Sequence, residues 1–230
     1  MSPDTWQEPL RNIAPTISLR FDSLIDAAEK PFRLGLFGGT FDPIHIGHLH
    51  IAEMAREQFA LDGVLFIPTG KPVRKIKAGF SNAQDRHAMV LGAIAGNEYF
   101  DVSRIEIDRK GTTYTIDTLR VLKDRYGDRA ELFFIAGTDT AADISTWKDA
   151  AEIGRLVVVL CARRATSQDA EPALLQGESD LDIRLIDSAL IDISSRELRD
   201  WVKRGRSIHY LVPSATRAYI KEQGLYRGQG

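Results

Sequence analysis

The sequence predicts an α/β fold in which a doubly wound parallel sheet is covered by helices on both faces. Short apolar runs bounded by Gly or Pro alternate along the chain with longer segments whose apolar residues recur every three or four positions. The chain has 230 residues, of which 43% are hydrophobic, and this is enough for one core. A sheet of this kind binds ligands at the carboxyl ends of its strands.

Each element is predicted from its apolar pattern and from the residues that bound it. Strands are predicted from short, largely apolar runs at residues 32–37, 64–67, 132–136, 156–160 and 183–186, and from alternation of apolar and polar residues at 100–107. A helix beginning near Ile46 or Gly47 carries Leu49, Ala52, Ala55 and Phe59 on one face. Four more helices are predicted: one from a capping box at residues 81–84 to about 97, one from Thr115 to Gly127, one from Ser194 or Ser195 to Gly205, and one from Pro213 to Gly224.

The chain divides into an N-terminal extension at residues 1–30, expected to be loosely ordered, and a single domain at residues 31–230. Within the extension, Phe21, Leu24, Ile25 and Ala28 have the spacing of one short amphipathic helix. Residues 163–180 are polar and predict a long loop.

Composition excludes several classes of function. The net charge is −2 and 27% of the residues are charged, so no basic excess indicates a nucleic-acid partner. No apolar run approaches the roughly 18 residues of a membrane span, and the acidic first 30 residues do not resemble a signal peptide. Cys161 is the only cysteine, which rules out an internal disulfide. We therefore expect a cytoplasmic protein without a membrane partner. No pattern indicates an oligomeric state.

The strongest motif is the segment at residues 38–48, which follows the first predicted strand directly and reads GGTFDPIHIGH. Gly38 and Gly39 allow a tight turn and a close approach to a phosphate. The helix that begins near Ile46 or Gly47 offers unpaired N–H groups and the positive end of its dipole. His45 and His48 are three residues apart, so they share one side of a helical turn. These features suit a nucleoside triphosphate.

Other interpretations of these residues have less support. Zinc requires three or four ligands, and His45, His48 and the nearby His50 have no further ligand, because Cys161 lies far along the chain in an apolar strand. We therefore predict no protein metal site. GxGxxG and GxxxxGK[ST] are both absent, so dehydrogenase and P-loop functions lose their main support. His50, His87 and His209 are expected to have structural or exposed roles.

The segment at residues 38–48 resembles the GxFDPxHxGH signature of the nucleotidyltransferase superfamily, and its form is similar to that of bacterial nicotinate mononucleotide adenylyltransferases. The resemblance covers about residues 32–227. Its further parts are IPTGKP at 67–72, QDRHAM at 84–89, TYT at 113–115 with Thr118 and Leu119, GTD at 137–139 with Trp147, ISS at 193–195 with Arg199, and GLY at 224–226. It implies a Rossmann-like sheet of the nucleotidyltransferase type.

The resemblance also implies an activity and a set of site residues. The activity is transfer of the adenylyl group of ATP, with Mg²⁺, to nicotinate mononucleotide, giving nicotinate adenine dinucleotide and pyrophosphate in NAD biosynthesis. The implied catalytic residues are His45, His48 and Arg199. The implied ATP-binding residues are Gly38, Gly39, Thr40, Phe41, Ser194 and Ser195. The implied mononucleotide-binding residues are Arg74 and Lys75 for the phosphate, Thr115 for the nicotinate carboxylate, Asp139 for ribose and Trp147 for the ring. Thr115 is also expected to cap its helix.

Two departures from the family pattern stand out. The family often has PPHK after the second strand, where this chain has Pro-Val-Arg-Lys at residues 72–75. The family's RPG is Arg-Arg-Ala at residues 163–165. Three alternatives stay open: an adenylyltransferase acting on nicotinamide mononucleotide, phosphopantetheine or another phosphate acceptor; a non-catalytic nucleotide sensor; and a tRNA synthetase fragment, although neither a KMSKS-like loop nor a basic surface accompanies the signature.

Overall fold

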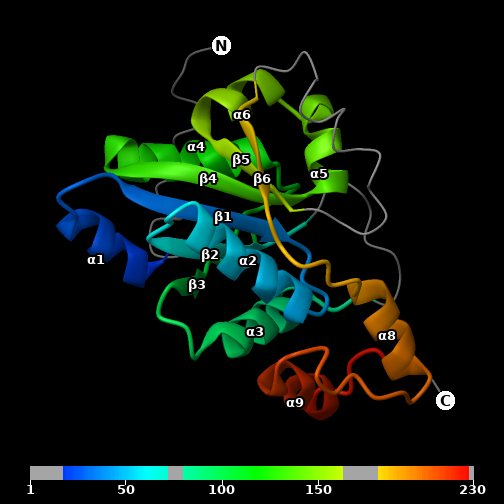
Figure 1. The fold of residues 1–230 in the computed structure, drawn as a ribbon. Helices are drawn as coiled ribbons and strands as arrows, with labels where there is room; N and C mark the ends of the chain where they lie inside the picture. The colour runs from blue at the N-terminus through cyan, green and yellow to red at the C-terminus, as the bar shows by residue number, and fades with distance from the viewer. Residues whose placement is uncertain (1–17, 72–79, 163–180, 228–230) are drawn as a thin grey trace.

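The computed structural model describes residues 18–71, 80–162 and 181–227. A six-stranded sheet runs through its centre in the order β3-β2-β1-β4-β5-β6, with every neighbouring pair parallel (Figure 1). The strands are β1 Phe32–Gly39, β2 Gly63–Pro68, β3 Phe100–Val102, β4 Ala130–Gly137, β5 Val158–Ala162 and β6 Ile183–Ile186. The predicted doubly wound parallel sheet is confirmed.

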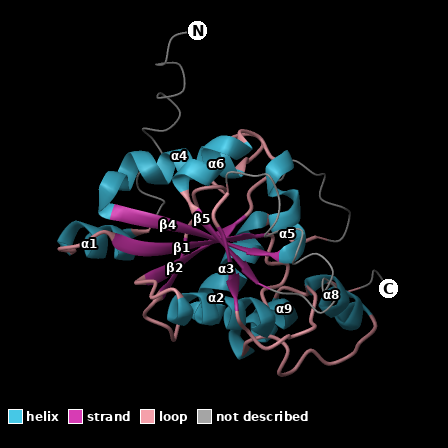
Figure 2. Ribbon diagram, turned by 45° about the horizontal axis from the view of Figure 1, so that its top comes forward, coloured by secondary structure: helices cyan, strands magenta, loops and turns pink. Residues whose placement is uncertain are grey.

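Helices cover both faces of the sheet. One core cluster includes residues of α1 Leu19–Ala27, α4 Thr115–Tyr126 and α6 Ala150–Leu156. The other includes residues of α2 Ile46–Gln58, α3 Ala83–Ile94, α8 Ser195–Lys203 and α9 Ser214–Glu222. Figure 2 shows the strands between α4 and α6 on one side and α2, α8 and α9 on the other.

Most residues of the central strands β1, β2 and β4 are apolar and buried, as is usual where helices cover both faces of a parallel sheet. In β1, Leu34 and Leu36 belong to one core cluster and Phe37 to the other, as the alternation of side chains along a strand requires. The chain leaves β1 toward α2 on one face and leaves β4 toward α6 on the opposite face. The connections that follow these two neighbouring strands therefore run to opposite faces of the sheet. A ligand-binding crevice forms at such a point, at the carboxyl ends of the strands.

The strand predicted at residues 100–107 is too long, since β3 ends at Val102. Ser103 still donates its N–H to Phe66 O at 2.9 Å, and the chain then turns away from the sheet. A Cβ on Gly70 would lie 1.9 Å from the carbonyl oxygen of Glu106, so the two backbones are in close contact. Ile105 is fully buried although it lies beyond β3, so the apolar residue there reflects burial and not strand pairing.

Helical structure between residues 138 and 156 was not predicted. It consists of α5 Thr138–Asp143, a 3₁₀ turn η4 at Ile144–Thr146, and α6. Leu156, expected to open a strand, ends α6. Each of these short pieces buries few apolar residues, Ile144 in η4 and Ile153 in α6, so no helical repeat is visible in the sequence.

The helix caps differ from prediction in two cases. Asn82 alone caps α3 by accepting from the N–H of Asp85, without the expected capping box. Tyr114 occupies the N-cap of α4 and Thr115 is its first residue, so the expected cap at Thr115 is wrong. The cap at Ser194 is confirmed, and Glu197 completes its capping box.

The short helix predicted near the N-terminus is confirmed as α1, which is capped by Ser18 and buries Phe21 and Ile25 in the core. Residues 18–27 are therefore packed, whereas residues 1–17 lie outside the described residues. The division into an extension and one domain stays a prediction. Among the described residues, none of the helices has the length and apolar character that crossing a bilayer requires.

Candidate active site

A cleft of about 590 Å³ opens at the carboxyl ends of β1 and β4. It brings together residues that lie far apart in the sequence. All three predicted catalytic residues and all six predicted ATP-binding residues line it, namely His45, His48, Arg199, Gly38, Gly39, Thr40, Phe41, Ser194 and Ser195. Their roles stay predictions, but their convergence on one cleft is a property of the fold.

The two histidines stand at the start of α2. His45 is the N-cap residue and His48 is the third residue of the helix. Their rings stack with centroids 3.7 Å apart, and the His45 backbone N–H donates to His48 Nδ1 at 3.2 Å. Because Nδ1 accepts this bond, the proton of a neutral His48 resides on Nε2. Glycine at position 47 leaves room for the His45 ring, since a Cβ there would lie 3.1 Å from His45 Nδ1.

The loop between β1 and α2 is tightly packed. Phe41 has φ of 51°, a left-handed conformation that is strained for a residue with a side chain. Its ring packs against the ring of His48 at 5.1 Å and that of Phe37 at 5.5 Å, and these contacts hold the conformation. A Cβ on Gly39 would lie 2.9 Å from the Phe41 ring, so glycine is needed at this position.

Arg86 is a site-forming residue to which the sequence analysis assigned no role. It is 1% exposed and donates to Thr40 O at 2.8 Å and to Thr69 O at 2.6 Å, thereby joining the ends of β1 and β2. Burial lowers the pKa of Arg86, and the nearby Asp42 opposes that effect. In the sequence, Arg86 was part of the QDRHAM segment of the family resemblance, but nothing there indicated its carbonyl partners.

Helix α8 closes the cleft from the other side. Ser195 Oγ donates to Pro43 O at 2.9 Å, and Arg199 Nη1 donates to Asp42 O at 2.5 Å. The Arg199 guanidinium also lies over the Phe80 ring, 4.3 Å from its centroid. The first turns of α8 are thus bonded to the loop that carries the histidines.

The predicted mononucleotide residues are less completely assembled. Thr115 lines the cleft as the first residue of α4. Asp139 is the second residue of α5, whose N-cap Gly137 and third residue Thr140 both line the cleft. Trp147 is half-buried, packs edge-on against Phe134 at 6.0 Å and is not among the lining residues. Arg74 and Lys75 lie outside the described residues.

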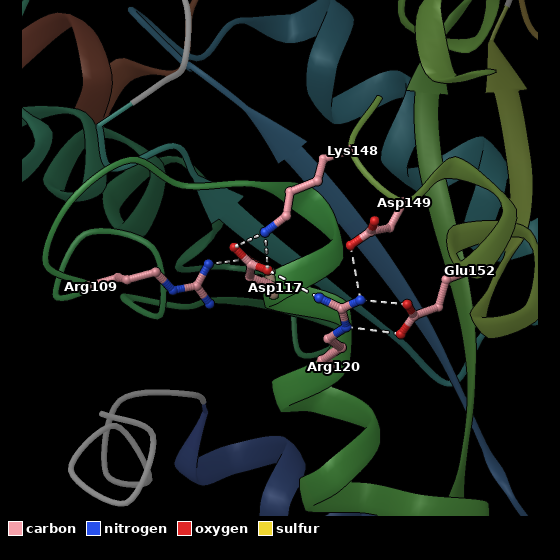
Figure 3. A network of polar contacts seen from close by, with 7 residues as sticks. Arg109, Asp117, Arg120, Lys148, Asp149 and Glu152 are labelled. Carbon is pink, nitrogen blue, oxygen red and sulfur yellow. Dashed lines mark hydrogen bonds and ion pairs between the residues drawn. The ribbon is translucent and has the colours of Figure 1, made fainter. Parts of the chain in front are cut away.

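A polar network fixes the segment after Trp147 to helix α4 (Figure 3). Lys148 Nζ donates to Asp117 at 3.1 Å and lies 4.7 Å from the ring centroid of Tyr114. Arg120 donates through Nη2 to Asp149 at 3.0 Å and through Nε to Glu152 at 2.9 Å. The first turns of α4, which begin at the cleft, are thereby tied to the residues beside Trp147.

Glu106 was also missed by the sequence analysis. Its buried carboxyl group lines the cleft and accepts from Thr118 Oγ1 at 3.0 Å, while Arg109 donates to the same Thr118 hydroxyl at 3.0 Å. Burial raises the pKa of Glu106, and the bond from Thr118 opposes that shift. In the sequence, Glu106 is one polar residue in an apparent strand, so nothing marked it as part of a site.

The remaining histidines lie apart from the cleft. His50, His87 and His209 are not among its lining residues. Burial lowers the pKa of His87, and His209 stacks on Tyr210 with ring centroids 4.0 Å apart. No group of three or more His, Cys, Asp or Glu side chains suited to a metal occurs within residues 18–71, 80–162 and 181–227.

Comparison with known proteins agrees with this geometry. A family model described as cytidylyltransferase-like matches residues 36–201. A probable nicotinate-nucleotide adenylyltransferase of Moorella thermoacetica is 43% identical over 209 residues, covering 88% of this chain and 95% of the relative. A protein of the same name from Desulfitobacterium hafniense is 42% identical over 202 residues, covering 86% and 97%.

A solved structure has the same fold. It is the Plasmodium falciparum nicotinic acid mononucleotide adenylyltransferase complexed with NaAD, which superposes with a TM-score of 0.71 at 19% identity. The match covers 84% of this chain and 97% of that one. From the length of the matches and the identity of the bacterial relatives, the chain belongs to the nicotinate-nucleotide adenylyltransferases, within the cytidylyltransferase-like family.

Proposed function

We propose that this protein transfers the adenylyl group of ATP to nicotinate mononucleotide, in the biosynthesis of NAD. An oxygen of the mononucleotide 5′-phosphate forms a bond to the α-phosphorus of ATP. The bond between that phosphorus and the oxygen bridging to the β-phosphate breaks, and its electron pair leaves with pyrophosphate. The product is nicotinate adenine dinucleotide. Because the acceptor phosphate is itself the nucleophile, no covalent enzyme intermediate is needed.

The observation that carries the proposal is the stacked pair His45 and His48 at the N-terminus of α2, facing the cleft with Arg199. Helix N–H groups, the Nε2 proton of His48 and the guanidinium are fixed donors for the charge that develops on the phosphates. Mg²⁺ would enter bound to the ATP phosphates and neutralise part of the leaving charge. Positioning and electrostatics supply most of the catalysis in transfers of this type.

The acceptor end of the cleft fits an acidic pyridine nucleotide. The N-terminus of α4 begins at Thr115 in the cleft wall, and backbone N–H groups at a helix start favour a carboxylate. Trp147 follows on the segment that the polar network ties to α4, where a short rearrangement of its ring would present a flat face to nicotinate. Arg74 and Lys75 are proposed to bind the mononucleotide phosphate.

Pyrophosphate release from ATP and Mg²⁺ tests the proposal, measured separately with nicotinate and nicotinamide mononucleotides. We expect rapid release with the acid and slower release with the amide. His48→Ala should lower kcat by roughly 100- to 1000-fold, the usual cost of losing one fixed donor. His50→Ala is the matched control, because His50 is in the same helix but does not line the cleft.

Two results would contradict the proposal. Release with neither mononucleotide, despite measurable ATP binding, would favour a nucleotide sensor or another acceptor. An equal decrease of kcat in His48→Ala and His50→Ala would show that the histidine pair does not contribute to catalysis.

A further inference from the structure

Three distant segments of the chain converge on the carboxylate of Asp42, which is 1% exposed. The Ser81 N–H faces both carboxylate oxygens, at 3.3 and 3.2 Å. The hydroxyl of Tyr226, 184 residues along the chain, donates to Oδ1 at 2.6 Å. Arg199 Nη1 lies 3.8 Å from Oδ2. A buried carboxylate requires such donors, because burial without them is costly.

Arg199 lies beside the Asp42 carboxylate but bonds to the backbone of Asp42. Arg199 Nη1 is within hydrogen-bond distance of the Asp42 carbonyl oxygen, at 2.5 Å, but is too far from the carboxylate for a direct bond. Its guanidinium lies on the Phe80 ring and borders the cleft. Arg86, another buried cation nearby, donates its hydrogen bonds to backbone carbonyl oxygens, including those of Thr40 and Thr69. Of these two arginines, Arg199 is the one that lines the cleft and also lies 3.8 Å from the Asp42 carboxylate.

The Tyr226 hydroxyl is the side-chain donor that bonds directly to the Asp42 carboxylate. Tyr226 is held in a left-handed conformation, with φ of 63°, shortly after Gly224, and its ring packs against the core of the α2 and α9 side. Burial and the negative charge of Asp42 raise the pKa of Tyr226, so its hydroxyl keeps the proton that it donates. Without this donor, the carboxylate would attract the guanidinium and draw it out of the cleft.

We propose that Tyr226 is a positioning residue for adenylyl transfer, whose hydroxyl satisfies Asp42 and so leaves Arg199 directed at the cleft. This inference rests on the proposed function, because it takes Arg199 to act on the phosphates of ATP. It gives the end of the chain a role in a site whose signature loop lies near the start.

The test is Tyr226→Phe, which removes the hydroxyl and keeps the ring. Tyr219→Phe is the matched control, since Tyr219 also donates to an aspartate, Asp85, at 3.1 Å. Neither Tyr219 nor Asp85 lines the cleft. We expect Tyr226→Phe to lower kcat roughly tenfold, the scale of one hydrogen bond to a charged group. The KM for the mononucleotide and the urea midpoint should match those of Tyr219→Phe.

A double-mutant cycle separates positioning from simple structural support. In an Arg199→Ala background, Tyr226→Phe should reduce kcat by no more than about twofold, because the residue through which it acts is gone. Equal losses in both backgrounds, or equal kcat for the two tyrosine variants, would overturn the inference while the wild type remains active. A wild type that releases no pyrophosphate would instead overturn the proposed function.

Discussion

Glu106 is a carboxyl group that the fold keeps away from water in the wall of the cleft. It is 9% exposed, and its neighbours are the Thr118 hydroxyl and, beyond it, the Arg109 guanidinium. Burial disfavours the charged form and raises the pKa of Glu106 above its ordinary value, although the Thr118 bond and Arg109 act in the opposite direction. The folded protein therefore holds this proton at higher pH than the unfolded chain does.

This shift predicts a pH dependence of stability. Stability from the protonated Glu106 is complete below its unfolded pKa and is lost as the pH rises through the higher folded pKa. Glu106→Gln removes the titration and keeps the shape. Relative to this variant, the urea midpoint of the wild type should fall as the pH rises above 4.5, the ordinary pKa of a glutamate, and should level off once folded Glu106 has lost its proton. The exposed Glu98 gives the control variant Glu98→Gln. If the urea midpoints of wild type and Glu106→Gln changed in parallel with pH, the raised pKa of Glu106 would be disproved.

At the scale of elements, the network in Figure 3 determines how the segment after Trp147 sits on α4. Asp149 has a left-handed backbone, with φ of 55°, and the bond from Arg120 helps to hold it there. The charged groups are about one-third to one-half exposed, so each ion pair contributes little stability by itself. Their main effect is geometric, because they fix the spacing between Trp147 and the start of α4.

Arg120→Met tests this effect on binding. If the network sets the nicotinate end of the cleft, the KM for the mononucleotide should rise several-fold, roughly 3- to 10-fold, while kcat and the KM for ATP stay within about twofold. Arg184→Met is the control, because Arg184 forms a similarly exposed ion pair with Asp182 at 2.7 Å on β6. A parallel rise in both KM values, or no rise, would show that the network does not act on the mononucleotide end.

The elements that could be predicted from the sequence are those with a repeated apolar pattern. Buried strands such as β1 and β4 are continuous apolar runs, and α2 carries its buried residues at helical spacing. The cleft followed from the motif at residues 38–48, because the end of a parallel strand fixes where its loop lies. Arg86 and Glu106 could not be predicted, since their importance depends on carbonyl and hydroxyl partners brought together only by tertiary structure.

For the molecule as a whole, α1 extends the core beyond the region of family resemblance. Phe21 is fully buried and packs against Phe32 of β1 with ring centroids 5.7 Å apart. A Cβ on Gly63 would lie 2.6 Å from the Phe21 ring, so the ring fills the space that this glycine leaves at the start of β2. Ser18 adds a hydrogen bond from its hydroxyl to Asp101 at 2.5 Å. Helix α1 therefore joins the beginning of the chain to three strands.

Phe21→Ala should consequently destabilise the entire domain and not only α1. A fully buried phenylalanine truncated to alanine costs about 3 to 5 kcal/mol of unfolding free energy, through lost burial and the cavity left behind. Leu24→Ala, in the same helix at a side chain that is 47% exposed, should cost no more than about 0.5 kcal/mol. Both values are measured from urea unfolding followed by far-UV circular dichroism.

Because Phe21 contacts Gly63, the urea unfolding transition of Phe21→Ala should remain a single cooperative step at a lower midpoint. Equal midpoints for the two variants would mean that α1 is not part of the cooperative core.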